Sequence, residues 1–196
     1  TIGRERPVLL AASTREGEEA LVLDAFARID VPDALLLLVP RHPQRFDEVA
    51  RLVASRGLAM QRRSETQAVR PETRVLLGDT MGEMFAYFRA ADVAFIGGSL
   101  VPTGGQNLIE ACAAGTPVLI GPHTFNFAEA TTQAIAAGAA LRVEDPDALG
   151  TAADHLLRDA DARSSMAAAG RHFAAAHRGA TDRAINLVEA VLSRRR

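Results

Sequence analysis

Several features that would assign a protein class at once are missing from the sequence. No run of about 18 or more apolar residues occurs, so no helix of this chain is expected to span a membrane. Cys112 is the only cysteine, which excludes an internal disulfide, and its alanine-rich surroundings favour core packing over a nucleophilic role. The net charge of −2 provides no basic field, which disfavours nucleic-acid binding.

The common signatures of nucleotide and metal sites are also missing. Neither the dinucleotide fingerprint G-x-G-x-x-G nor the P-loop G-x-x-x-x-G-K-[ST] occurs, so hydride transfer and ATP hydrolysis lose their usual sequence support. No spacing of histidines or paired carboxylates indicates a metal, and no Ser-His-Asp or Cys-His set is indicated. We therefore expect neither a metal nor a cofactor. The chain starts at Thr1 without an initiator Met, and we expect it to be a fragment of a longer protein.

What the sequence does contain is an alternation of short apolar runs and amphipathic helical stretches. With 196 residues, 48% of them hydrophobic, the chain suits one domain. Near-continuous apolar runs separated by helices predict an α/β fold with a doubly wound, mostly parallel sheet. The predicted strands are 7–13, 34–40, 74–79, 91–98 and 116–122, with weaker ones at 58–62 and 139–143.

Helix signals complete this pattern. Ser13 with Glu16, and Thr80 with Glu83, match capping boxes, and Pro146 after Asp145 suits a first helical turn. Only helices are predicted after the last strand, so the fold ends in a helical C-terminal tail. The predicted helices are 14–29, 43–56, 81–90, 105–114, 125–137, 146–158, 161–176 and 181–194, the last with one apolar face and ending in three arginines, 194–196.

Glycine, proline and polar residues gather in the loops that follow the predicted strands. Ligands of open parallel sheets bind at the carboxyl ends of the strands, where these loops lie together. The sequence therefore predicts a ligand site at this edge of the sheet. The loops read STREGEE, PRHPQRF, GDTMGE, GGSLVPTGGQN and GPHTFNF.

The loop GGSLVPTGGQN and the residues after it indicate ligand binding more clearly than the other loops do. Gly104 and Gly105 would open a helix whose free N–H groups suit a phosphate or carboxylate. Asn107 and Glu110 would lie on one face near the helix start, where a carboxylate accepts two hydrogen bonds from a ribose diol. The same residues also suit a tight turn with a glutamate at the positive end of a helix. This loop alone therefore does not distinguish a ligand site from a structural turn.

The other loops supply further candidates. Gly82 would let the backbone approach a ligand, and Arg41 could bind a phosphate or carboxylate bidentately. Arg15 lies at a helix start, where a cation is unfavourable, which indicates function. The alternative for this turn is a solvated first helical turn with Glu16, Glu18 and Glu19 as neighbours.

In combination, these motifs resemble a known family. The stretches AASTREGEE, PRHPQRF, GDTMGE and AFIGGSLVPTGGQNLIEACAAGTPVLIGPHTFNF occur in this order within residues 11–127. They are similar to the C-terminal half of the 3-deoxy-D-manno-octulosonic acid (Kdo) transferases of lipid A assembly. Two positions depart from the family pattern, because Arg15 and Gln106 stand where histidine is often expected.

The resemblance implies a GT-B glycosyltransferase with two Rossmann-like domains. Residues 1–196 would be its single donor-binding domain, with CMP-Kdo as the donor. The lipid A precursor would bind to the missing N-terminal domain, which would also carry the catalytic glutamate and contact the membrane. No catalytic residue is expected in this chain, which would be inactive alone. The full-length protein would lie at the cytoplasmic face of the bacterial inner membrane, and this fragment would be soluble.

The resemblance also implies a set of binding residues. Glu110 would hold the ribose, backbone N–H groups near 81–83 or 104–107 would hold the phosphate, and the loop 40–41 would flank the base. Further candidates near the Kdo or the phosphate are Ser99, Gly104 and Gly105. The implied CMP contacts are Pro40, Arg41, Met81, Gly82, Glu83, Asn107, Leu108, Ile109 and Glu110.

Two other functions fit the residues. The same fold serves glycosyltransferases and epimerases that use UDP-sugars. A nucleotide-binding module without a catalytic partner domain would also show these loops, since a fold does not fix a function.

Overall fold

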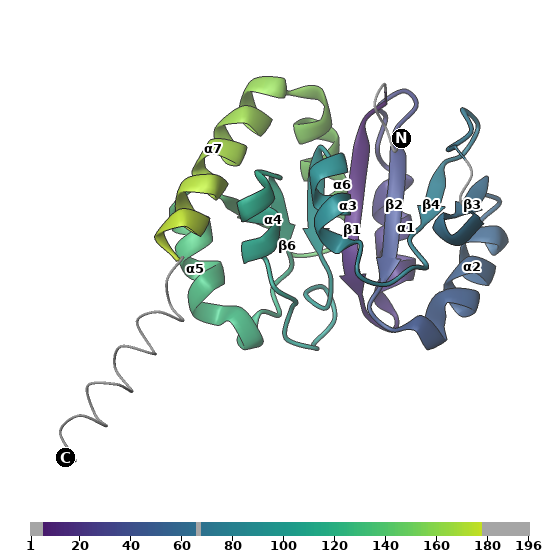
Figure 1. Cartoon of the computed structure of the whole chain (residues 1–196), viewed down its shortest axis with the longest axis horizontal. Helices are drawn as coiled ribbons and strands as arrows, with labels where there is room; N and C mark the ends of the chain where they lie inside the picture. The colour runs from purple at the N-terminus through teal and green to yellow at the C-terminus, as the bar shows by residue number, and fades with distance from the viewer. Residues whose placement is uncertain (1–5, 66–67, 178–196) are drawn as a thin grey trace, which may run out of the picture.

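A seven-stranded, fully parallel sheet forms the centre of the computed structural model, which describes residues 6–65 and 68–177 (Figure 1). The strand order is β3-β4-β2-β1-β5-β6-β7, with every neighbouring pair parallel. The predicted doubly wound sheet is confirmed, including its two weaker strands. The strands are β1 (Val8–Thr14), β2 (Leu35–Pro40), β3 (Met60–Arg62), β4 (Val75–Leu77), β5 (Val93–Ile96), β6 (Val118–Ile120) and β7 (Ala140–Arg142).

Helices cover both faces of this sheet and give it two hydrophobic layers. One layer joins the sheet to α1 (Glu18–Phe26), α2 (Phe46–Ser55) and α6 (Pro146–Arg158). The other joins it to α3 (Met84–Ala90), α4 (Ile109–Ala114), α5 (Ala128–Ala136) and α7 (Ala160–Ala176). Helix α7 belongs to both, because Met166 packs against the first layer and Phe173 lies in the second. Three short 3-10 turns complete the described elements: Pro43–Arg45, Arg63–Glu65 and Phe125–Phe127.

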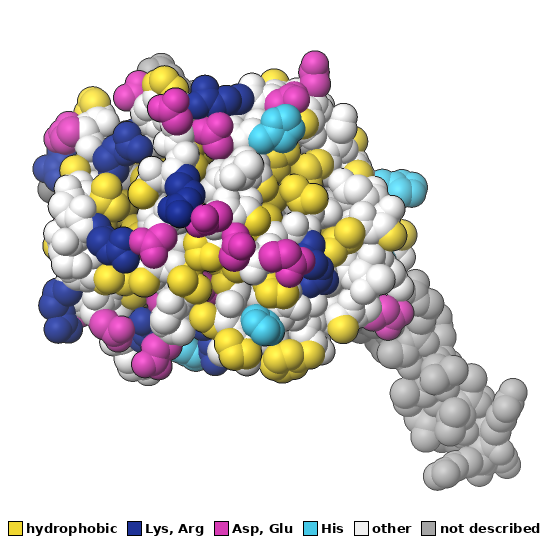
Figure 2. Space-filling model, turned by 180° about the vertical axis from the view of Figure 1, so that it is seen from behind, with side chains coloured by type: hydrophobic (Ala, Val, Ile, Leu, Met, Phe, Trp, Pro, Cys, Tyr) yellow, Lys and Arg dark blue, Asp and Glu magenta, His cyan; other side chains and the backbone are white. Residues whose placement is uncertain are grey.

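The strands are apolar on both sides because both sides are covered. Along β1, Leu9 and Ala11 face the first layer, and Leu10 and Ala12 face the second. The outer surface over α1, α2 and α6 mixes arginine with acidic side chains (Figure 2). Exposed ion pairs such as Arg28 with Asp147 account for this mixture.

Both predicted capping boxes are wrong. Ser13 has φ 58° at the irregular end of β1, so it cannot begin a helix, and α1 starts at Glu18 after Gly17. The Thr80 hydroxyl contacts the carboxylate of Glu83 instead of a backbone N–H, and α3 starts at Met84. The third start signal is confirmed, because Asp145 caps α6 with its Oδ1 2.8 Å from the Ala148 nitrogen.

The predicted helix at 105–114 also starts later, at Ile109. Gly104 and Gly105 have φ of 93° and 74°, values outside the helical region, so they form a loop and do not open the helix. The predicted helix 181–194 and the arginines 194–196 lie outside the described residues. Within the described part of the chain, no helix combines the length and apolar character needed to cross a membrane.

One buried carboxylate fixes the loop that follows β5. Glu18 is fully buried, and its Oε1 accepts hydrogen bonds from the backbone N–H groups of Ser99 (3.0 Å) and Leu100 (2.9 Å). Its Oε2 accepts from those of Gly98 (2.6 Å) and Arg15 (3.1 Å). Burial raises the pKa of this carboxyl, although the four N–H donors act in the opposite direction. The alternative of a solvated turn with Glu16, Glu18 and Glu19 is therefore wrong for Glu18 and Glu19, which are buried, while Glu16 is exposed.

Replacing Glu18 by glutamine should destabilise the domain. In Glu18→Gln an NH₂ group replaces one oxygen, so two of the backbone N–H groups lose their acceptor. We expect the free energy of unfolding, measured with urea, to fall by about 2–4 kcal/mol. The exposed Glu16→Gln is the matched control and should change it by less than about 0.5 kcal/mol. Equal stability of the two variants would show that Glu18 does not hold the loop.

Candidate functional site

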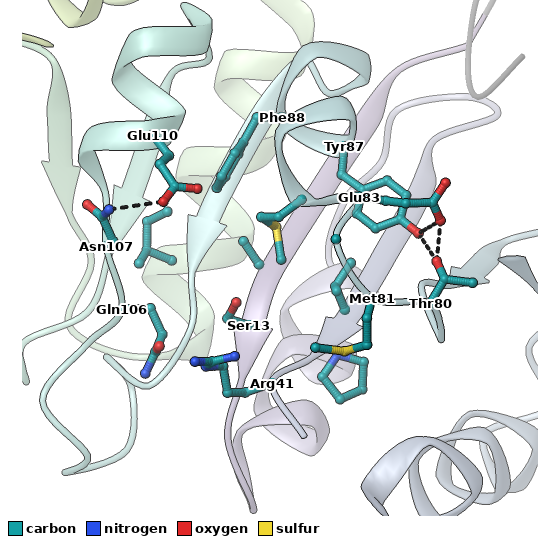
Figure 3. A pocket seen from close by; sticks show the side chains of 16 residues that line it. Ser13, Arg41, Thr80, Met81, Glu83, Tyr87, Phe88, Gln106, Asn107 and Glu110 are labelled. Atoms are coloured by element: carbon teal, nitrogen blue, oxygen red, sulfur yellow. Dashed lines mark hydrogen bonds between the residues drawn. The ribbon is translucent and has the colours of Figure 1, made fainter. Parts of the chain in front are cut away.

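A pocket of about 280 Å³ opens at the carboxyl ends of the strands, where the sequence predicts a ligand site. It lies between the loops after β1, β2 and β4 and the start of α4 (Figure 3). The chain passes from β1 to β2 on one side, while β5 lies on the other side of β1. The pocket therefore occupies the point where the strand order reverses, which is where doubly wound sheets bind ligands.

Seven of the nine residues predicted to contact a nucleotide line this pocket. Leu108 and Ile109 do not, and the Leu108 side chain is buried in the second hydrophobic layer. The seven are Pro40, Arg41, Met81, Gly82, Glu83, Asn107 and Glu110. The structure brings them together from three loops and one helix, and their roles in binding stay predictions.

The three further candidates lie outside the pocket lining. The buried Ser99 hydroxyl donates to the Ile96 carbonyl at 2.5 Å and accepts from the Gly121 N–H at 2.8 Å, so the side chain links two strand ends. Gly104 lies against Asn126, and Gly105 lies against the backbone of His123. These contacts account for the three residues as parts of the loop framework.

Asn107 and Glu110 form a unit at the start of α4, on one side of the pocket (Figure 3). The Asn107 Oδ1 accepts a hydrogen bond from the Ile109 N–H at 2.9 Å, and its Nδ2 donates to Glu110 Oε1 at 3.2 Å. No hydrogen bond to the other Glu110 oxygen is present among the described residues. An exposed carboxylate held in this way can accept hydrogen bonds from a ligand diol.

Across the pocket, Glu83 is engaged in a polar network. Its carboxylate accepts hydrogen bonds from Thr80, from the Tyr87 hydroxyl at 3.0 Å and from Arg63 at 2.7 Å. The Thr80 hydrogen bond and the Arg63 charge hold the pKa of Glu83 below its usual value. The Glu83 carboxylate is occupied by these hydrogen bonds. Met81, which is 62% exposed, is therefore the side chain of this loop that is available to a ligand.

The remaining end of the pocket is basic. The Arg41 guanidinium lies there near Ser13 and points toward Gln106, away from Met81 (Figure 3). Arg41 forms no ion pair with any residue that the structure describes. A polar pocket with a cation at one end and a carboxylate on one side suits a ligand that has both an anionic group and a diol.

Ser13 and Tyr87 are pocket residues that the sequence did not predict. The left-handed φ of Ser13 depends on the irregular pairing of β1 with β2, which no local signal announces. For Tyr87 a signal exists, because it follows Glu83 at helical i,i+4 spacing.

Comparisons with known proteins show the family of the chain. Residues 19–173 match the family "Glycosyl transferases group 1". The chain is 53% identical over 190 residues to the 3-deoxy-D-manno-octulosonic acid transferase of Bordetella pertussis, covering 94% of this chain and 44% of that protein. The solved C-terminal CMP-Kdo binding domain of WaaA from Acinetobacter baumannii is 32% identical with a TM-score of 0.82, covering 87% of this chain and 90% of that one. The chain belongs to the Kdo transferases, within the group 1 glycosyl transferases.

The predicted resemblance to Kdo transferases is thus confirmed. The Kdo transferase of Haemophilus influenzae is 39% identical, covering 97% of this chain and 45% of that protein. The chain spans about half the length of the curated relatives it matches. Anabaena Alr3699/HepE in complex with UDP has a TM-score of 0.70 at 15% identity, which shows the fold alone. The predicted fold, a Rossmann-like half of a GT-B enzyme, is confirmed.

The environment of Tyr87 should be visible by titration. Burial raises the pKa of Tyr87 to about 12 from its ordinary 10.0. Tyr87 is the only tyrosine and the chain has no tryptophan, so phenolate absorbance reports this residue alone. We expect a midpoint near 12 in the native chain and near 10 in urea.

The same titration has a consequence for stability with a defined sign. Between pH 10 and 12 the unfolded chain releases the phenolic proton while the native chain keeps it, so the free energy of unfolding should fall as pH rises. Tyr87→Phe should lose this component of the pH dependence. A native midpoint near 10 would mean that the phenol is exposed, against the structure.

Proposed function

We propose that this chain is the donor-binding domain of a CMP-Kdo-dependent transferase. The observation that carries the proposal is the likeness to the CMP-Kdo binding domain of Acinetobacter baumannii WaaA, which extends over 90% of that domain. The pocket supports it, because the residues that the resemblance implies converge at the reversal point of the sheet. Relatives named as transferases favour this function over a module without catalytic activity.

The pocket suggests how CMP would lie. Glu110, oriented by Asn107, would accept hydrogen bonds from the ribose hydroxyls. Pro40 and Met81 would flank the cytosine, while the Arg41 guanidinium and the backbone around Gln106 would face the phosphate. The ribose and the phosphate would then be recognised by groups of opposite charge on different elements.

The complete protein would transfer Kdo from CMP-Kdo to a lipid A precursor. The bond between the anomeric carbon of Kdo and the phosphate oxygen breaks, and CMP leaves with the electron pair. The acceptor hydroxyl oxygen bonds to the anomeric carbon, and its proton passes to a glutamate of the other domain. The donors around Arg41 would stabilise the charge that develops on the phosphate. Residues 1–196 would form one domain of this two-domain enzyme at the cytoplasmic face of the inner membrane, and acceptor and membrane contacts would belong to the other domain.

Calorimetric titration of the chain with CMP tests the proposal. We expect CMP to bind more tightly than UMP, UDP or AMP. Glu110→Ala should weaken CMP binding by about 10- to 100-fold, as expected for the loss of a charged hydrogen-bond acceptor. Glu72→Ala is the matched control, since Glu72 is an exposed glutamate of the turn before β4, outside the pocket lining. Tighter binding of UDP than of CMP would contradict the proposal and favour a UDP-sugar enzyme.

The chain alone should bind CMP-Kdo without transferring Kdo. No group of the pocket is assigned as the base for an acceptor hydroxyl, because that role is proposed for the other domain. Incubation with radiolabelled CMP-Kdo and a lipid A precursor should leave the acceptor unlabelled. Labelled product from the chain alone would show that it contains a complete active site.

A further inference from the structure

A basic pair adjoins the nucleotide pocket without lining it. Arg15 follows β1 and His42 follows β2, and the Arg15 Nη1 lies 2.9 Å from the His42 Nε2. Because a guanidinium only donates, the imidazole accepts through Nε2 and its proton is on Nδ1. The Arg15 guanidinium supplies the positive charge of the pair.

Among the residues that the structure describes, this charge has no acidic partner. Arg15 forms no ion pair within residues 6–65 and 68–177. The two buried glutamates nearby are already committed, Glu18 to four backbone N–H groups and Glu19 to Thr14 and Arg45. Together with Arg41, Arg15 gives this end of the site two cations that form no ion pair with a carboxylate of the described residues. The arrangement differs from the mixed charges over α1, α2 and α6.

Gly98 sets the position of Arg15 relative to the pocket. A Cβ added at Gly98 would lie 3.1 Å from Arg15 Cγ and 3.5 Å from Gln106 Nε2, so both side chains pack over this glycine. Gln106 lines the pocket, as do Ser13, two residues before Arg15, and Arg41, which directly precedes His42. The pair therefore extends the basic end of the pocket beyond the place proposed for the phosphate.

We propose that Arg15 and His42 form a subsite for the carboxylate of the donor sugar. The inference rests on the proposed function, in which the ligand is an ester of an ulosonic acid. In such an ester the carboxylate and the phosphate oxygen are attached to the same anomeric carbon, so the two anionic groups lie close together. With the phosphate at Arg41, the carboxylate would meet Arg15, whose guanidinium suits a two-pronged contact with a carboxylate. Arg15 is then a specificity-determining residue of the donor site.

The subsite separates recognition of the sugar acid from recognition of the nucleotide. CMP lacks the carboxylate, so its affinity should not depend on a specific contact with Arg15. CMP-Kdo should bind the wild-type chain more tightly than CMP does, and Arg15 should account for that difference.

Titration of four chains with CMP and with freshly prepared CMP-Kdo tests the subsite. The chains are wild type, Arg15→Gln, His42→Ala and Arg89→Gln, the last being the control for charge, because Arg89 is exposed on α3 and outside the pocket lining. We expect Arg15→Gln to weaken CMP-Kdo binding about tenfold and CMP binding less than about threefold. His42→Ala should also weaken the binding of both ligands, CMP-Kdo more than CMP, by smaller factors than Arg15→Gln does. Arg89→Gln should match wild type, and thermal unfolding confirms that each variant is folded.

Each other outcome overturns the subsite. Equal weakening of CMP and CMP-Kdo by Arg15→Gln would assign Arg15 to the phosphate or to the general field of the site. Unchanged CMP-Kdo affinity in Arg15→Gln, or no preference of wild type for CMP-Kdo over CMP, would show that no carboxylate contact exists there. In these cases CMP still binds, so the proposed function survives. Binding of neither ligand to any of the chains would remove the proposed function and the subsite together.

Discussion

The backbone N–H groups of Arg15, Gly98, Ser99 and Leu100 converge on the Glu18 carboxylate, and much of the ligand edge depends on this interaction. It joins the start of α1 to the loop after β5, segments about eighty residues apart in the chain. The close approach of the two strand ends adds to this constraint. A Cβ at Gly97 would lie 2.5 Å from the Ser13 carbonyl oxygen, so only glycine fits there. At the reversal point of the sheet, the Glu18 carboxylate and the lack of a side chain at Gly97 thus hold the strand ends and loops together.

The site is built from elements with separate supports. The α4 side depends on Asn107, which accepts a hydrogen bond from the Ile109 N–H at the start of the helix and orients Glu110. The β4–α3 loop depends on Glu83, whose carboxylate gathers Thr80, Tyr87 and Arg63. Because the side chains that shape the loops are mostly bound to one another, the groups left for a ligand are few. The available groups are a carboxylate on one side of the pocket and arginines at its basic end. This arrangement agrees with a nucleotide that carries an acidic sugar.

The sheet and the location of the site could be predicted from the sequence because their signals are local. Strands covered on both faces are apolar at every position, as in β1 and β2, and parallel strands bring their following loops to one edge. The helix starts near Ser13 and Gly104 could not be predicted, because the positive φ of both residues belongs to loops held by partners distant in sequence. The burial of Glu18 could not be predicted for the same reason, since nothing in STREGEE indicates which glutamate meets residues 98–100.

The attachment of the loop after β5 to Glu18 also has a kinetic meaning. A segment that is already held by buried hydrogen bonds has little conformational entropy left to lose when a ligand arrives. Encounter then requires no slow loop rearrangement, and the positive charges of Arg15 and Arg41 would speed the approach of an anion at low ionic strength. Ligands that differ only in their contacts within such a preformed site differ mainly in how long they stay bound. Residence time, more than rate of arrival, is therefore the quantity through which this domain would distinguish one donor from another.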